Sequence, residues 1–336
     1  MRRRLQPMRR PLTGLPLLLV AVLGATTVHA TDDRIVAARG FLDTLDPGQQ
    51  DTASAAISAP DRDDWSYLPG PRPGLRIADL DANQLASLDA FLETALGAES
   101  ARRVRRIRDT EPIEDRGGGV RLGPDEFRVR FFGLDRPGNP PAWSWRIEGH
   151  HLSLHQTFVD GRPVSITPIF LGSVVRRDGG GEVLGPEDML AHSILRSIPD
   201  EHRAEGLDPR PLPGDLRTAM RRSDRWSFEG GVPLSLAGEL ARDHADLVVD
   251  RLLAMHPEGV RRPLRQAWSA VPDDRIVFAW CGREDRRGPH QWRLVSPVLV
   301  VEFSHSGGNV EHGHLVLRTP TGEFPDSATE AWNDAP

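Results

Sequence analysis

The sequence predicts an α+β fold, a single domain in which two antiparallel β-meanders pack against helices. Three observations support this fold class. Strand-like runs gather in two blocks, 126–172 and 275–318, and a helical block precedes each of them, 35–110 and 185–268. The two β blocks also share an order: an aromatic run ending in Gly, a loop, then Trp-Arg and a long strand-like run. Counting from Trp145 and Trp292, His155 and Glu302 both fall ten residues on, so the blocks fit a duplicated helix-plus-meander unit.

The first 30 residues predict an export signal that is cleaved near Ala30. "MRRRLQPMRR" is basic, "LPLLLVAVLGATTV" is apolar, and "VHA" supplies small residues for cleavage. The apolar run is shorter than the roughly 20 residues of a membrane span. We therefore expect residues 31–336 to form a periplasmic or extracellular domain without a stable membrane anchor.

Charge and cysteine content limit the partners of that domain. The formal charge is -6, and loss of the five leader arginines moves it to -11 (-6 minus 5), so we expect no nucleic-acid binding. The chain has one cysteine, Cys281, which excludes an internal disulfide and is interpreted as a buried small hydrophobe in "FAWCG". A small-molecule ligand or substrate fits this composition, and the sequence leaves protein partners open.

The helices are read from apolar spacing. "DDRIVAARGFLDTL" predicts a short helix, and residues 80–108 predict helix interrupted at Gly97. Pro186 begins a helix in "GPEDMLAHSILRSI", and Ser235 caps a longer one through "SLAGELARDHADLVVDRLLAMH". One buried face of that longer helix is expected to hold Leu240, Leu247, Val248, Leu252 and Met255. The histidines of these helices, His192, His244 and His256, are expected to be structural.

The strands follow "FRVRFFG", "AWSWRIEGHHLSLHQTFV", "RPVSITPIFLG", "RIVFAWCG", "HQWRLVSPVLVVEF" and "HLVLR", with "SHSGGNVE" as a hairpin turn. On a strand, alternate side chains share a face. His312 and His314 would then point the same way, and so would His151 and His155. His150 would lie opposite with Glu148, unless a bulge at Gly149 re-aims one of the pair.

Two of these stretches, "WRIEGHHLSLH" and "EFSHSGGNVEHGH", hold six of the twelve histidines. Neutral imidazole binds zinc, copper, iron and nickel, and carboxylates often complete such sites. The candidate metal ligands are His150, His151, His312, His314 and Glu302. A hydrogen-bonded network of histidines is the competing interpretation, and an exposed sheet face is the third.

The same stretches resemble the domain of unknown function 3500 family, a group of largely exported proteins. The resemblance begins at "WSYLPGPRPGLRIADL", is strongest at "WSWRIEGHHLSLH", and continues through "TPIFLG" and "VEFSHSGGNVEHGHLVLR", so that it spans roughly residues 35–325. The residues of this chain that match the family's motifs are Trp145, Arg146, Glu148, Gly149, His150, His151, Glu302, His312 and His314. His155 stands where the family more usually has Asn, and Trp332 lies near the position of a final family histidine that this chain lacks. The resemblance implies one exported domain with a histidine-rich site and no established activity.

The hypothesis from the sequence is a divalent transition-metal site for zinc, iron or cupric copper, since Cys and Met are scarce around it. With an open coordination position, metal-activated water would give a hydrolase, in which Glu148 is the general base and Arg146 shapes the substrate pocket. Oxidative chemistry on iron or copper is the second choice. The rival interpretations are a non-enzymatic envelope protein that binds a ligand or metal, and a purely structural histidine network. His155 and His305 are left as further candidates for the site.

Overall fold

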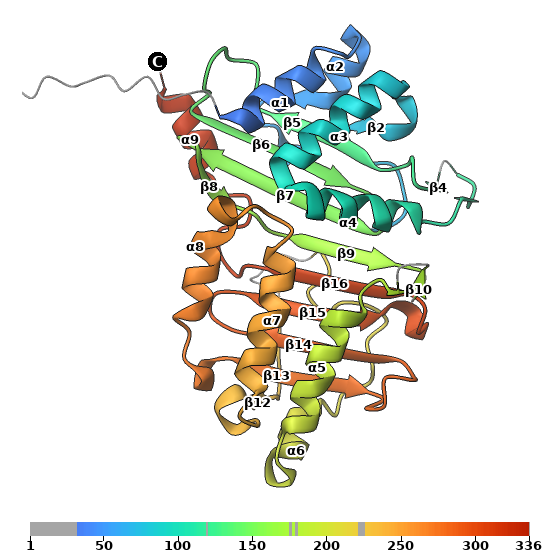
Figure 1. The fold of residues 1–336 in the computed structure, drawn as a ribbon, viewed down its shortest axis with the longest axis vertical. Helices are drawn as coiled ribbons and strands as arrows, with labels where there is room; N and C mark the ends of the chain where they lie inside the picture. Colours follow the sequence, from blue (N-terminus) through green and yellow to red (C-terminus); the bar gives the residue numbers. More distant parts are fainter. Residues whose placement is uncertain (1–31, 119, 175–176, 179–180, 221–225, 336) are drawn as a thin grey trace, which may run out of the picture. The chain divides into compact units, whose positions relative to one another are not determined.

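The protein, described from a computed structural model, is built on a single large sheet (Figure 1). The structure describes residues 32–335 except 119, 175–176, 179–180 and 221–225, so the predicted leader lies outside the described residues. The sheet has 12 strands in the order β1-β5-β6-β7-β9-β16-β15-β14-β13-β12, with β2 beside β5 and β8 beside β7. Most neighbouring strands are antiparallel, and β1 runs parallel to β5. The α+β fold class predicted from the sequence is confirmed.

Two meanders make up most of the sheet. The first contains β5 (Arg128–Phe132), β6 (Ala142–Glu148), β7 (Leu152–Val159) and β9 (Ile169–Ser173). The second contains β13 (Val277–Gly282), β14 (His290–Val295), β15 (Val300–His305) and β16 (Gly313–Arg318). The shorter strands of the sheet are β1 (Ser54–Ala55), β2 (Leu75–Arg76), β8 (Arg162–Ser165) and β12 (Val232–Pro233). Two hairpins lie outside the sheet: β3 (Glu114–Asp115) pairs with β4 (Arg121–Leu122), and β10 (Arg177–Asp178) pairs with β11 (Gly181–Glu182). Antiparallel pairing of β9 with β16 joins the two meanders.

The two meanders have the same connectivity and the same register. Trp145 pairs with Gln156 in the first, and Trp292 pairs with Phe303 in the second, so both strands are offset by 147 residues (292 minus 145). Gly133 after β5 and Gly282 at the end of β13 both have positive φ, 72° and 91°. A side chain at either glycine would also meet a backbone oxygen within 3.0 Å. This repeated geometry agrees with the duplication inferred from the sequence.

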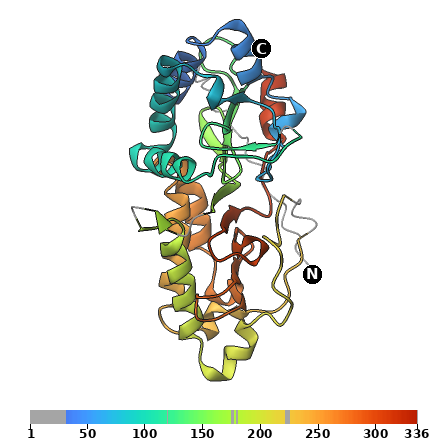
Figure 2. The same ribbon diagram turned by 90° about the vertical axis from the view of Figure 1, so that its right-hand side faces the viewer.

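Helices cover one face of the sheet, and loops cover most of the other (Figures 1 and 2). The helices are α1 (Asp33–Leu42), α2 (Pro47–Ala53), α3 (Ala82–Leu96), α4 (Ala98–Asp109), α5 (Gly185–Ser197), α6 (Asp200–Gly206), α7 (Ala241–Leu253), α8 (Glu258–Ser269) and α9 (Ser327–Asp334). On the helical face Trp145 and Trp292 are fully buried, and Phe91 of α3 stacks edge-on against Trp145 at 4.8 Å. None of the helices in the described ranges is long and apolar enough to cross a bilayer.

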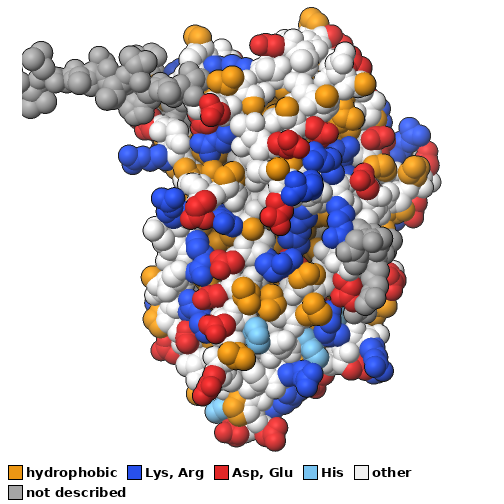
Figure 3. Space-filling view, in the orientation of Figure 1, with side chains coloured by type: hydrophobic (Ala, Val, Ile, Leu, Met, Phe, Trp, Pro, Cys, Tyr) orange, Lys and Arg blue, Asp and Glu red, His pale blue; other side chains and the backbone are white. Residues whose placement is uncertain are grey.

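The opposite face of the sheet carries charged side chains that hold the covering loops. Arg146 donates to the backbone oxygens of Asp61 and Asp64, and Glu302 accepts from the backbone N–H groups of Arg217 and Thr218. Buried charges are tolerated only when they are paired and hydrogen-bonded, so these contacts anchor the loops to the sheet. The surface on the helical side instead mixes arginines with acidic side chains (Figure 3).

Both long strand-like runs of the sequence are hairpins rather than single strands, which corrects the prediction. The first run reverses at Gly149–His151, where Gly149 N donates to Leu152 O at 2.7 Å, and the second reverses at Ser296–Leu299. A Cβ on Gly149 would lie 2.3 Å from Phe127 Cδ1, so only glycine allows the chain to turn this close to Phe127. The prediction that His150 and His151 point to opposite faces of a strand is therefore wrong, because both lie in the turn.

The prediction for α7 is also partly wrong. The helix begins at Ala241 after Leu240, and Ser235 lies in a separate 3-10 turn, so it caps nothing in α7. Leu240 and Leu247 are 58% and 49% exposed, whereas Val248, Leu252 and Met255 are buried as expected. The buried stripe of α7 includes Ala245, Val248 and Leu252, and Leu247 lies outside it. The break at Gly97 and the buried thiol of Cys281 are confirmed.

Candidate metal centre

Four imidazoles converge where the β6–β7 turn meets the start of β16. Turn residues His150 and His151 lie beside His312 and His314, and the ring centroids of His312 and His314 are 4.6 Å apart. The nearest ring nitrogens of His150, His151 and His312 all lie within 4.8 Å of one another. Gly172 of β9 makes room for them, because a Cβ there would lie 2.5 Å from His151 Cδ2 and 3.1 Å from His314 Cδ2. Histidines from two distant parts of the chain thus form one cluster.

Hydrogen bonds on the Nδ1 side fix the orientation of three of the rings. Nδ1 of His150 lies 2.7 Å from the backbone oxygen of Tyr67. Nδ1 of His151 lies 2.6 Å from Glu111 Oε2, and Nδ1 of His314 lies 2.8 Å from Asp215 Oδ1. Such partners hold metal-binding histidines in proteins, because an Nδ1–H donor leaves Nε2 free to bind the metal.

The Nε2 side of the cluster has too few partners. Nε2 of His150 and Nε2 of His314 are buried without a hydrogen-bond partner. Nε2 of His151 lies 2.9 Å from Nε2 of His312. An unsatisfied buried polar atom costs about 1–3 kcal/mol. Three of these histidines, His150, His151 and His312, could therefore hold a metal ion.

Three imidazoles of the cluster, those of His150, His151 and His312, are neutral at neutral pH. Burial lowers the pKa of His150 to about 4 despite its hydrogen bond with Tyr67, and burial together with His314 lowers that of His312 to about 4. Burial and the neighbouring His150 also lower the pKa of His151 well below its usual value. Neutral imidazole is the form that binds a metal ion, so no proton has to be displaced from these rings at pH 7.

Glu111 and Asp215 place two carboxyl groups next to the cluster. Glu111 is buried, and its burial raises its pKa to about 8. Burial also opposes ionisation of Asp215, but His314 and the hydrogen bonds from Leu216 N and Ser306 together lower the pKa of Asp215. At pH 7 Asp215 is therefore ionised and Glu111 is mostly protonated, so only Asp215 carries negative charge beside the rings. Neither residue was predicted from the sequence: Glu111 follows α4 in "DTEP", and Asp215 lies in the loop "PGDLR", without any histidine or ligand pattern nearby.

The predicted catalytic pair Arg146 and Glu148 lies in a neighbouring network instead. Glu148 Oε1 accepts from Ser153 Oγ at 3.0 Å and lies 3.2 Å from His155 Nε2, while Arg146 Nε lies 3.3 Å from Glu148 Oε2. Burial opposes ionisation of Glu148, but His155 and Arg146 together lower its pKa to about 2. A carboxylate this acidic and this fully bonded holds the sheet and loop together and is a poor proton acceptor near pH 7.

The predicted ligand Glu302 is also engaged elsewhere. Its carboxylate accepts hydrogen bonds from both backbone and side-chain donors: Arg217 N at 2.6 Å, Thr218 N at 2.9 Å, Thr218 Oγ1 at 2.8 Å and Gln291 Nε2 at 2.8 Å. These bonds tie the loop around residue 217 to the sheet. Among the described residues, the ligand atoms that meet within 4.8 Å come from histidines alone.

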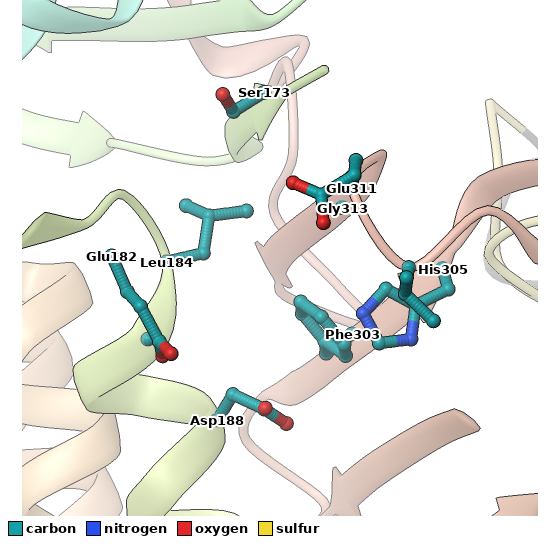
Figure 4. A pocket seen from close by; sticks show the side chains of 10 residues that line it. Ser173, Glu182, Leu184, Asp188, Phe303, His305, Glu311 and Gly313 are labelled. Carbon is teal, nitrogen blue, oxygen red and sulfur yellow. The ribbon is translucent and has the colours of Figure 1, made fainter. Parts of the chain in front are cut away.

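His155 and His305 lie apart from the cluster. His155 belongs to the Glu148 network, and its ring packs edge-on against Phe324 at 5.0 Å. His305 lies in a separate cavity with Asp188, Glu182 and Glu311 around it (Figure 4). Its Nδ1 accepts from the backbone N–H of His290 at 3.2 Å. The structure therefore brings together His150, His151, His312 and His314 from the sequence candidates.

A small cavity of about 10 Å³, close to the volume that one water molecule needs, lies beside the cluster near β4. His150 and Glu111 line it together with Arg72, Arg121 and Phe127. Arg72 donates to the backbone oxygens of Ser66 and Gly149, so it holds the turn that carries His150 and His151. Trp143 and Trp145 do not line this cavity and are buried in the core of the helical face.

The fold and this cluster define an α+β protein with a buried histidine site that could hold a metal ion. A family model described as a protein of unknown function (DUF3500) matches residues 28–326, and the chain belongs to this family. No curated protein and no solved structure matches the chain.

Proposed function

We propose that the protein binds one divalent transition-metal ion through the Nε2 atoms of His150, His151 and His312, with His314 facing the fourth position. One observation carries this proposal. The Nδ1 atoms of three rings are held by Tyr67, Glu111 and Asp215, while the Nε2 atoms of His150 and His314 are buried without partners. In a purely structural network, both ring nitrogens of each buried histidine would have hydrogen-bond partners. His256 shows this pattern, because both of its ring nitrogens have such partners.

The ligand chemistry suits zinc, iron or cupric copper. All donors are imidazole nitrogens, which suit zinc, copper, iron and nickel, and the carboxylates stand behind the ligands. X-ray absorption on zinc-loaded protein is expected to show only nitrogen or oxygen ligands, with nitrogens at about 2.0–2.1 Å. Removal of His312 should abolish that signal. A sulfur ligand, or an unchanged spectrum in His312→Ala, would contradict the assignment.

We further propose that the ion activates water for hydrolysis. Three histidines leave one position for water on a zinc ion, and a bound metal can lower the pKa of that water to about 7. The small cavity beside His150 and Glu111 has about the room that one such water molecule needs. The test compares metal-loaded, chelator-treated and His312→Ala protein on esters, amides and phosphate esters. Activity that is equal in all three samples would refute metal-dependent hydrolysis.

A closed, non-enzymatic metal site is the second candidate, and the unpaired Nε2 of His314 favours it. If His314 is the fourth ligand, His314→Ala should lose most of the metal affinity. If His314 instead contacts a metal-bound water, His314→Ala should keep the metal and change the chemistry. We also propose, on the sequence pattern of residues 1–30 alone, that the protein is exported, and N-terminal sequencing of the mature protein tests this.

A further inference from the structure

The duplicated register gives every residue of the histidine cluster a counterpart in the other half of the sheet. The offset of 147 residues relates His150 and His151 in the first turn to Pro297 and Val298 in the second. Across the next strand pair, Leu154 pairs with Ile169 and Val301 pairs with Leu317, which is an offset of 148 residues (317 minus 169).

Counting back by this second offset relates the two histidines at the start of β16 to residues just before β9. His312 corresponds to Val164, and His314 corresponds to Ile166. All four histidines of the cluster are therefore exchanged for apolar residues in the other half.

These four counterparts line one cavity of about 350 Å³. Val164, Ile166, Pro297 and Val298 lie on its sheet side, and residues of α8 such as Val260 and Leu264 complete it. If this half of the sheet had only lost the metal-binding histidines, packed side chains would fill the place of the cluster. Here Val164 stays 39% exposed and borders an open space of the size of a small-molecule site.

The lining of this cavity defines the chemistry of its ligand. None of the described residues that line it is charged, although 27% of the chain is Asp, Glu, Lys or Arg. Its polar groups are hydroxyls, including those of Thr167, Thr319 and Thr321. Thr167 Oγ1 lies 2.9 Å from Thr319 Oγ1, so one hydroxyl of this pair keeps a proton to donate to a ligand. A charged ligand would lose its hydration here without gaining an opposite charge.

We propose that this cavity is a second binding site, which takes a neutral organic molecule with an apolar body and a hydroxyl, carbonyl or amine group. The site is the duplicated counterpart of the histidine cluster, with metal ligands in one half and a neutral-ligand cavity in the other. The inference uses strand register and lining alone, so it stands independently of whether the cluster holds a metal.

The experiment uses the neutral fluorophore N-phenyl-1-naphthylamine with the full mature chain. Wild type is expected to bind it saturably with one site. Ala267→Trp places an indole in the cavity from an exposed position of α8, and Val298→Arg places a charge there. Each change should weaken binding at least tenfold. Because Ala267 is exposed, its variant should fold normally, and far-ultraviolet circular dichroism checks this.

The matched control is Leu240→Arg, which removes an exposed apolar side chain beside α7 and should leave probe binding unchanged. His312→Ala/His314→Ala and added zinc should also leave it unchanged. Absence of saturable binding in wild type, equal binding in folded Ala267→Trp, or loss of binding in Leu240→Arg would each overturn the proposal.

Discussion

The carboxylate of Glu111 gives the sharpest prediction about the metal centre. Its Oε2 atom lies 2.6 Å from Nδ1 of His151, and both side chains are 1% exposed. When a metal occupies Nε2, the ring must carry its proton on Nδ1, and that proton is donated to Glu111. Glu111→Gln keeps an acceptor oxygen but cannot ionise when the ion binds, and Glu111→Ala removes both the oxygen and the ionisable group.

Loss of such a partner typically reduces metal affinity 10–100-fold, which is about 1.4–2.7 kcal/mol. We expect Glu111→Ala to show the full effect and Glu111→Gln to show part of it. The assay is competition for zinc against a chelator of known affinity. Glu126→Gln is the matched control, because Glu126 lines the same cavity but pairs with Arg76. If Glu111→Ala binds zinc within twofold of wild type, the proposed role of Glu111 is wrong.

Three further predictions test neighbouring parts of the account. Gly172→Ala should weaken zinc binding at least tenfold, because its Cβ would displace the His151 ring. Gly259→Ala is the control and should not weaken binding, because the space around Gly259 is open. Chelator competition measures zinc affinity in both variants. Glu148→Gln should lower the free energy of unfolding by about 3 kcal/mol or more, because it leaves Arg146 partly unpaired, and it should keep the metal stoichiometry. Urea denaturation and elemental analysis measure these two effects, and loss of metal would show that Glu148 acts in the site. Burial lowers the pKa of His256 to about 4, so the unfolded chain binds more protons than the folded protein as pH falls from about 6.5 to 4. The free energy of unfolding should therefore fall over this range, with a contribution from His256 of at most about 3 kcal/mol. His256→Gln should flatten this pH dependence, and an unchanged slope would contradict the prediction.

Most of the fold could be predicted from the sequence because the apolar spacing and the repeated order are local signals. Gly97 separates α3 from α4 as expected, and the two β blocks became the two meanders. The hairpin turns at Gly149–His151 and Ser296–Leu299 were missed because their flanking residues are as strand-like as the strands themselves. The cause of the first turn is a contact with Phe127, which strand periodicity does not reveal.

The candidate site was predicted in part for the same reason. The histidines stand together in the sequence, so His150, His151, His312 and His314 could be named. Glu111 and Asp215 reach them only through tertiary contacts, 40 and 99 residues away from their histidine partners. Glu148 and Glu302 are close to the histidines in sequence, but their hydrogen bonds hold the loops over the sheet.

The most direct test of the metal centre is elemental analysis of the untagged protein after incubation with zinc and removal of excess ion. The account predicts about one zinc per chain in wild type and in the control His202→Ala/His244→Ala, whose histidines lie outside the cluster. It predicts a large loss of zinc in His312→Ala/His314→Ala. No zinc in wild type, or equal zinc in all three folded proteins, would contradict the central claim and leave the histidines as a structural network.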